Sequence, residues 1–147
     1  MRKNGVSDYK NFAFEVLKVS QKKPVSFEIF ADDLAEMERQ AIEISKWGEN
    51  LNVKIPITNT KGESTKDLIA TLSKRKIICN ITAILTIEQL NTVVNVLDSD
   101  TPAILSIFAG RISDTGIDPS PIMAEAVKIS NSKPKSEILW ASTRELY

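Results

Sequence analysis

The stretch LNVKIPI, residues 51–57, alternates branched apolar residues with Asn52, Lys54 and Pro56. A period of two is typical of a β-strand whose two faces meet different surroundings. The apolar set can pack against a layer of helices, and it consists of Leu51, Val53, Ile55 and Ile57. The other set directs a lysine, with no obvious partner, to the opposite face. The fold and the function must both explain Lys54.

The composition excludes several classes of protein and of binding site. The 147 residues suit one domain over 1–147, and 19 basic against 19 acidic residues give no net charge. We therefore expect no nucleic-acid or membrane partner. The lack of histidine and the single cysteine, Cys79, exclude a disulfide framework and a Cys/His zinc site. No apolar run reaches the roughly 20 residues of a membrane span. We expect a soluble cytoplasmic protein without metal or cofactor.

Strand patterns alternate with helix patterns along the chain. Strands are expected over 25–30, 51–57, 77–82, 103–109 and 137–142. Helices are expected over 7–20, within 32–50, around 65–74, from the capping box TIEQ at 86–89, and over 120–130. Another helix is expected to begin in TRELY, and GRISDTGIDPS is read as a polar loop. The expected helix caps are Ser7, Asp32 or Asp33, and Ser120, with Gly48 as a stop.

Five strands that alternate with helices predict an α/β fold with a parallel sheet. The alternatives are a doubly wound open sheet and a (β/α)8 TIM barrel. In a doubly wound sheet both faces meet helices, so its strands read as nearly continuous apolar runs. Here each strand carries polar residues on one parity, as in the pairs Ser26 and Glu28, Asn52 and Lys54, Asn80 and Thr82. This pattern favours the barrel, with a polar interior and chemistry at the carboxyl ends of the strands.

A lysine in such an interior is a candidate nucleophile. An amine held among apolar walls has a lowered pKa, and a neutral amine can attack a carbonyl to form a Schiff base. Glu28 can serve proton transfer through water, while Asn80 and Thr82 offer neutral groups that orient an imine or a water. The plainer interpretations are an edge-strand surface lysine, an exposed carboxylate and loop-capping residues. Each of these interpretations is plausible for one residue alone. They are less plausible together, because the complementary groups come from three successive strands.

Five motifs stand out along the chain: VSFEIFADD (25–33), NVKIP (52–56), NIT (80–82), LSIFAGRISD (105–114) and WASTR (140–144). Through these motifs the chain resembles transaldolases, the Schiff-base (β/α)8 enzymes of the pentose phosphate pathway. The motifs occur in the family's order and at about its spacing, over almost the whole chain.

The resemblance implies a role for each matched residue. Lys54 matches the lysine that forms the imine with a ketose phosphate, Glu28 the glutamate that holds the catalytic water, and Thr82 the threonine that positions this water. Asn80, Ser106 and Phe108 match substrate-facing residues. The implied phosphate clamp consists of Arg111, Ser142 and Arg144. Arginines give bidentate, charge-assisted bonds to phosphate, although solvated loop arginines would be the default interpretation without the motif.

The resemblance also bears on the reaction and on its alternatives. Family members that act as fructose 6-phosphate aldolases tend to carry Gln at the position of Glu28 and Tyr at that of Phe108. We therefore expect transaldolase-type transfer of a dihydroxyacetone unit between sugar phosphates, with fructose 6-phosphate aldolase as the alternative. A non-catalytic module that binds sugar phosphates or assembles through an open sheet edge, as a homo-oligomer or with another chain, also stays open. A nucleotide-binding sheet is disfavoured because no glycine-rich phosphate loop follows a strand.

The family pattern is incomplete in this sequence. A transaldolase barrel opens with a strand that carries an essential aspartate and a strand with TTNP, and neither occurs here. The matched strands correspond to the third to the seventh, and a typical barrel needs about 250 residues. We therefore expect a partial barrel, a fragment at both ends with two bare sheet edges, that is weak or inactive alone.

Overall fold

The computed structural model describes residues 5–21 and 23–144 and contains one parallel sheet lined by helices. The strands are β1 (Val25–Glu28), β2 (Leu51–Pro56), β3 (Cys79–Ile84), β4 (Ala103–Ile107) and β5 (Ser136–Trp140). The helices are α1 (Tyr9–Ser20), α2 (Leu34–Ile44), α3 (Lys66–Lys74), α4 (Ile87–Val96), α5 (Ala109–Ser113) and α6 (Ser120–Ser130). The strand order is β1-β2-β3-β4-β5 and every pair is parallel. The expected α/β fold, consistent with a partial TIM barrel, is confirmed.

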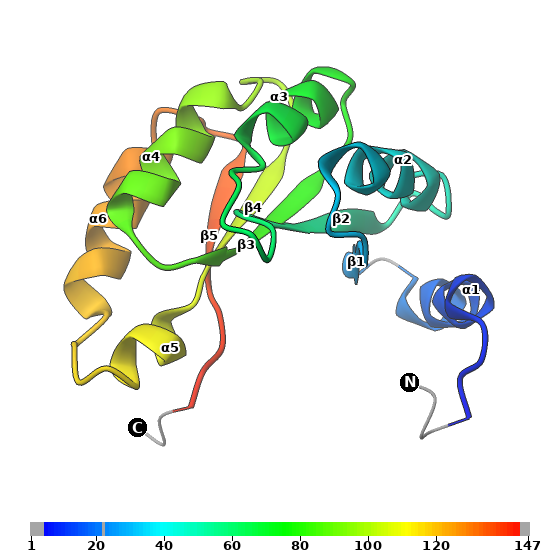
Figure 1. Cartoon of the computed structure of the whole chain (residues 1–147), viewed down its shortest axis with the longest axis horizontal. Coiled ribbons are helices and arrows are strands. Elements are labelled where there is room, and N and C mark those ends of the chain that lie inside the picture. Colours follow the sequence, from blue (N-terminus) through cyan, green and yellow to red (C-terminus); the bar gives the residue numbers. More distant parts are fainter. Residues whose placement is uncertain (1–4, 22, 145–147) are drawn as a thin grey trace.

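The two faces of the sheet differ as the alternation in LNVKIPI predicts. Val53, Ile55 and Leu105 are fully buried in the core. That core lies between the sheet and α2, α3, α4 and α6, which follow its convex side (Figure 1). Asn52 and Lys54 alternate with Val53 and Ile55 and therefore point to the concave side. Burial of one face against helices thus leaves the other face for polar side chains.

Helix caps follow the expected chemistry with small shifts in position. The side chain of Asp8, and not of Ser7, accepts the Asn11 N–H at the start of α1. Asp33 caps α2 in the same way. The capping box between Thr86 and Gln89 at α4 is confirmed. Other details were wrong: Ser120 lies inside α6 with Pro119 at the cap position, and α2 ends at Ile44, before Gly48.

Several strand boundaries differ from the expected ones by one to two residues: β3 covers Cys79–Ile84 and not 77–82, and β5 covers Ser136–Trp140 and not 137–142. β1 ends at Glu28, two residues early, because the N–H groups of Phe30 and Ala31 donate to the side chain of Gln40. β4 ends at Ile107, and α5 begins inside the segment expected as strand and polar loop. The helix expected in TRELY falls largely on residues 145–147, which lie outside the described residues, and Thr143 and Arg144 are not helical.

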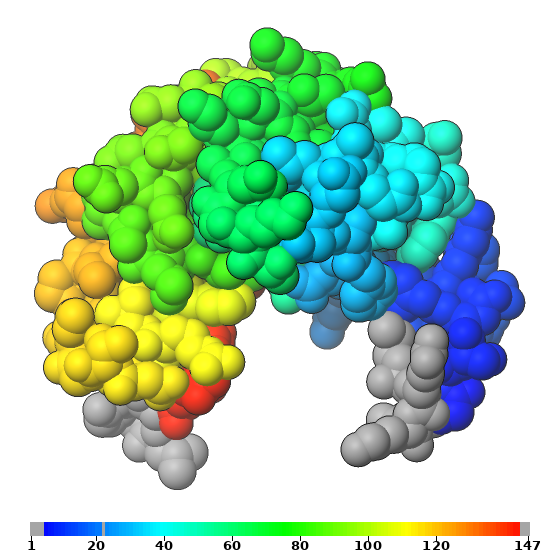
Figure 2. All heavy atoms as spheres, in the orientation of Figure 1, coloured from blue at the N-terminus to red at the C-terminus, as the bar shows by residue number. Residues whose placement is uncertain are grey.

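The sheet forms an open arc. β1 and β5 each pair with one strand among the described residues. The space-filling view shows a hollow concave side between α1, in blue, and α5, in yellow (Figure 2). Within residues 5–21 and 23–144 no helix is long and apolar enough to cross a membrane. In the same residues no group of three or more His, Cys, Asp or Glu side chains is arranged to hold a metal ion.

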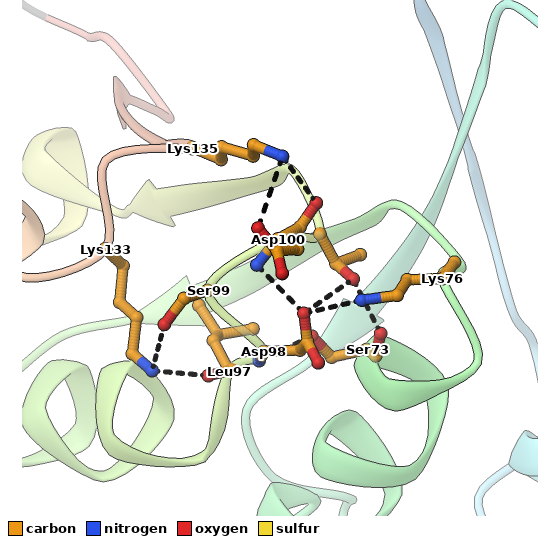
Figure 3. Close-up of polar contacts among 9 residues, drawn as sticks. Ser73, Lys76, Leu97, Asp98, Ser99, Asp100, Lys133 and Lys135 are labelled. Carbon is orange, nitrogen blue, oxygen red and sulfur yellow. Dashed lines mark hydrogen bonds and ion pairs between the residues drawn. The ribbon is translucent and has the colours of Figure 1, made fainter.

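A polar network joins the loops at the amino ends of the strands (Figure 3). The Asp98 carboxylate accepts from Lys76 Nζ at 2.8 Å, and the Asp98 N–H donates to Ser73 Oγ at 2.9 Å. Thr101 Oγ1 donates to the Ser73 carbonyl at 2.8 Å. Lys133 Nζ donates to the carbonyl of Leu97 at the end of α4. The network ties α3, the α4–β4 loop and the segment before β5 together, opposite the carboxyl ends of the strands.

We expect Asp98→Asn to lower the thermal unfolding midpoint at pH 7. The hydrogen bond from Lys76 is the main cause that lowers the pKa of Asp98 below its usual 3.8. A carboxyl with a lowered folded pKa stabilises the fold above its unfolded pKa and loses this contribution as the pH falls through the folded value. The difference from wild type should therefore shrink as the pH falls below the usual pKa of 3.8 and through the lowered folded pKa. Asp100→Asn is the control because that side chain is 83% exposed and lies 3.6 Å from Lys135. Equal effects of the two variants, or a pH-independent effect of Asp98→Asn, would contradict the argument.

Candidate active site

Three candidate residues lie in one row on the concave face. Glu28 of β1 is the register partner of Lys54 of β2, and Lys54 is the partner of Asn80 of β3. Neighbouring strands in a parallel sheet lie about 4.8 Å apart, so the three side chains leave the sheet side by side. The row lies at the carboxyl end of β1 and in the middle of β2. The structure thus brings together the carboxylate, amine and amide that the sequence singles out.

Lys54 and Glu28 form a partly exposed ion pair. Lys54 Nζ lies 3.4 Å from Glu28 Oε2, and their side chains are 31% and 44% exposed. The cross-strand neighbours of Lys54 on this face are a carboxylate and an amide. Exposed pairs contribute only about 0–1 kcal/mol. The amine can therefore leave Glu28 for another partner at little cost.

Asn80 is held between two serines. Its Nδ2 donates to Ser26 Oγ at 2.9 Å, and its Oδ1 accepts from Ser106 Oγ at 2.7 Å. Asn80 and Ser106 are 5% and 2% exposed, so this chain of hydrogen bonds crosses the interior from β1 to β4. Ser26 was not among the expected site residues, although its parity with Glu28 was the signal for it. The two contacts fix the amide orientation next to Lys54.

Thr82 carries a buried hydroxyl next to an irregularity in the sheet. It is 2% exposed, and among the described residues its Oγ1 has no hydrogen-bond partner. The β3–β4 register shifts between Ile81 and Ile84, and Ala83 adopts φ +61°. Bulges re-aim side chains, and an unsatisfied buried hydroxyl costs about 1–3 kcal/mol. A small group that hydrogen-bonds to the Thr82 hydroxyl would therefore be favourable at this position.

The arginines of the expected clamp come from two segments in close contact. A Cβ on Gly110 would lie 1.7 Å from the Ser142 carbonyl oxygen and 3.3 Å from Arg144 Cγ. The Gly110 N–H donates to the Ala141 carbonyl at 3.4 Å. Arg111, next to Gly110, is exposed, and Arg144 Nη1 lies 3.0 Å from Asp114 Oδ2. Phe108, half-buried, precedes α5 at the end of β4. Arg111, Ser142 and Arg144 therefore gather at the carboxyl ends of β4 and β5.

The single cysteine is not a candidate nucleophile. Cys79 is buried on the helix-facing side of β3, and burial raises the pKa of its thiol to about 12. Only the thiolate is strongly nucleophilic, and it is scarce at neutral pH with such a pKa. Lys54 remains the candidate nucleophile of the concave face.

Comparisons with known proteins agree on one family. The family model described as Transaldolase/Fructose-6-phosphate aldolase matches residues 6–147. A probable transaldolase of Dehalococcoides mccartyi is 35% identical over 127 residues, which are 86% of this chain and 55% of that protein. A probable transaldolase of Streptococcus agalactiae is 32% identical over 140 residues, 95% of this chain and 61% of that protein. The chain thus spans between half and two thirds of the length of these relatives.

We expect Gly110→Ala to destabilise the fold by about 1–3 kcal/mol, the usual cost of forcing extra volume into a packed site. The added Cβ meets a backbone carbonyl at 1.7 Å, and the backbone has little freedom to yield. Urea unfolding measures the effect. Gly48→Ala is the control because its Cβ would meet the flexible end of Leu17 at 3.0 Å. Equal stability of the Gly110→Ala variant and wild type would show that 141–144 does not pack against α5.

Proposed function

Because the chain belongs to the transaldolase/fructose-6-phosphate aldolase family, we propose that it carries the imine-forming part of a transaldolase-type active site. The reaction is the transfer of a dihydroxyacetone unit between sugar phosphates through a Schiff base on Lys54. The observation that carries the proposal is the row of Glu28, Lys54 and Asn80, with the Lys54 amine 3.4 Å from the carboxylate.

The proposed chemistry starts with the neutral amine of Lys54. Its nitrogen attacks the ketone carbon of a ketose phosphate and forms a carbinolamine, which loses water to give the protonated imine. Glu28 supplies and removes protons in these steps, directly or through a water. The imine then acts as the electron sink for cleavage of the adjacent carbon–carbon bond. None of the proposed residues takes the role of the base for that cleavage, so we expect the 147-residue chain alone to have weak or no turnover.

Neutral groups orient the reacting atoms in this proposal. The buried hydroxyl of Thr82, without a described partner, would hold the water that exchanges protons with Glu28. Asn80, fixed by Ser26 and Ser106, would present its remaining hydrogen-bonding capacity to substrate hydroxyls. Such groups cost no rearrangement when the reaction proceeds, because the fold orients them beforehand.

The phosphate of the substrate is assigned to Arg111, Ser142 and Arg144. Two guanidinium groups at adjoining segments suit the bidentate, charge-assisted bonds that a phosphate accepts. The ion pair of Arg144 with Asp114 is partly exposed and therefore weak, so a dianion can displace the carboxylate. Late strands of a barrel are a frequent phosphate site.

Two residues support transaldolase over fructose 6-phosphate aldolase. Glu28 provides a carboxylate where the aldolases tend to have Gln, and Phe108 lacks the hydroxyl of the Tyr they tend to carry. On the family resemblance alone, we further propose the pentose phosphate pathway as the setting and the cytoplasm as the location.

Borohydride trapping with fructose 6-phosphate tests the Schiff base. We expect the wild-type chain to gain one reduced sugar-phosphate adduct on Lys54, located by peptide mass spectrometry, without measurable turnover. Lys54→Met should abolish the adduct, because it removes the only proposed nucleophile and keeps the side-chain volume similar. Lys18→Met is the control, because Lys18 pairs with Glu15 on the exposed surface of α1 and should not affect trapping.

Absence of Lys54-dependent trapping in a chain shown to be folded would remove the imine proposal. If that chain still binds inorganic phosphate, the non-catalytic sugar-phosphate-binding module becomes the better interpretation. Turnover by the isolated chain at the rate of an ordinary enzyme, about 1 per second or faster, would instead contradict the expectation of weak or absent activity.

We expect Arg111→Gln to raise the fructose 6-phosphate concentration for half-maximal trapping about 10-fold or more, the value of one charge-assisted hydrogen bond. Trapping with dihydroxyacetone, which has no phosphate, should stay unchanged. Arg39→Gln on α2 is the control because Arg39 pairs with Glu36 at the surface. An equal loss of trapping with both sugars would show that Arg111 acts on the fold and not on the phosphate.

A further inference from the structure

The free edge of β1 is covered at one residue. β1 uses one side for β2, where the N–H groups of Val25 and Ile29 donate to the carbonyls of Asn50 and Lys54. The backbone groups of alternate residues point away from that partner, so the N–H and C=O of Glu28 point to the open edge. The edge was expected to be bare, yet Tyr9 of α1 lies against it.

The hydroxyl of Tyr9 serves both backbone groups of Glu28. The Glu28 N–H donates to Tyr9 Oη at 3.1 Å, and Tyr9 O–H donates to the Glu28 carbonyl at 3.4 Å. A phenol can accept and donate at once, so one oxygen replaces the two hydrogen bonds that a neighbouring strand would make. The backbone N–H and C=O of Glu28 can therefore bond either to Tyr9 or to a neighbouring strand, but not to both.

The ring of Tyr9 is held in place by other aromatic side chains. It makes edge-to-face contacts with Phe27, Phe30 and Trp47, at centroid distances of 5.9, 4.9 and 5.7 Å. Such pairs have a preferred geometry and restrict the ring. Burial raises the pKa of the Tyr9 hydroxyl, so the proton that it donates stays in place. The contact to Glu28 thus comes from a side chain with little freedom to move.

We propose that Tyr9 is a positioning residue of the active site, whose hydroxyl fixes the backbone of Glu28 and thereby holds the Glu28 carboxylate beside Lys54. The inference rests on the proposed function, which makes this pair the centre of imine formation. Glu28 is the last residue of an edge strand, and Tyr9 gives its outward backbone groups their only described partner. A displacement of about 1 Å in a reacting group can cost about 100-fold in rate, so this restraint matters for chemistry.

Tyr9→Phe tests the proposal because it removes the hydroxyl and keeps the aromatic ring. Hydrogen–deuterium exchange should become about 5-fold faster at the Glu28 amide, since one hydrogen bond is lost. Exchange of the Ile29 amide, which donates to Lys54 on the other side of β1, should not change. Ser20→Ala is the matched control, because it removes another hydroxyl of α1, which accepts from Asn50 at 3.0 Å and lies away from Glu28.

The second measurement is the rate and pH profile of Lys54 trapping at saturating fructose 6-phosphate. We expect Tyr9→Phe to slow trapping about 10-fold and to change the pH profile, while Ser20→Ala at comparable stability keeps both. Unchanged trapping in folded Tyr9→Phe, or unchanged Glu28 exchange, overturns the proposal. If the folded wild-type chain shows no trapping at all, the proposed function fails separately. In that case hydrogen–deuterium exchange tests the Tyr9 contact by itself. Faster exchange of the Glu28 amide in Tyr9→Phe supports the positioning of Glu28, and unchanged exchange overturns it.

Discussion

The parallel register of β1, β2 and β3 is the constraint on which the candidate site depends. It sets Glu28, Lys54 and Asn80 side by side, although they are 26 residues apart along the chain at each step. Because side chains alternate between faces, a slip by one residue would turn Lys54 into the helix layer and an apolar residue into the interior. Burial of Val53 and Ile55 against the helices resists such a slip. The core therefore specifies the site without contributing a side chain to it.

The polar interior is supported by connections between strands more than by charge. Ser26, Asn80 and Ser106 form a continuous chain of hydrogen bonds from β1 to β4. Buried polar groups stabilise a fold only when their partners are in place, and this chain satisfies both ends of the Asn80 amide. Lys54 and Glu28, by contrast, are partly exposed and weakly paired. Fixed neutral groups beside a movable charged pair suit a site in which the amine changes partners.

The sequence predicts the elements through periodicity and caps, and it predicts the site through the polar parity of the strands. Lys54, Glu28 and Asn80 could be placed on one face because side chains alternate along each strand, and on neighbouring strands because consecutive strands of a barrel are adjacent. The register shift between Ile81 and Ile84 and the contact of Gly110 with Ser142 could not be predicted, because they depend on backbone geometry that no residue pattern encodes. The role of Tyr9 was hidden for a different reason. A tyrosine in a helical segment does not reveal where its hydroxyl lies, and only tertiary packing places it against the backbone of Glu28.

Two of the four non-glycine residues with positive φ in the described part of the chain, Ala83 and Ser142, lie next to candidate residues, whereas Gln21 and Lys76 lie just after α1 and α3. Ala83, at φ +61°, follows Thr82 in the chain. Ser142, at φ +59°, lies against Gly110 and comes two residues before Arg144. Non-glycine residues in this region cost of the order of 1–3 kcal/mol and persist where the surroundings hold them. At Thr82 the conformation accompanies a buried hydroxyl without a described partner, and at Ser142 it allows a close backbone contact with α5. Relaxing either residue would favour stability and would move a group that the proposed chemistry needs, so strain and function at these positions are opposed.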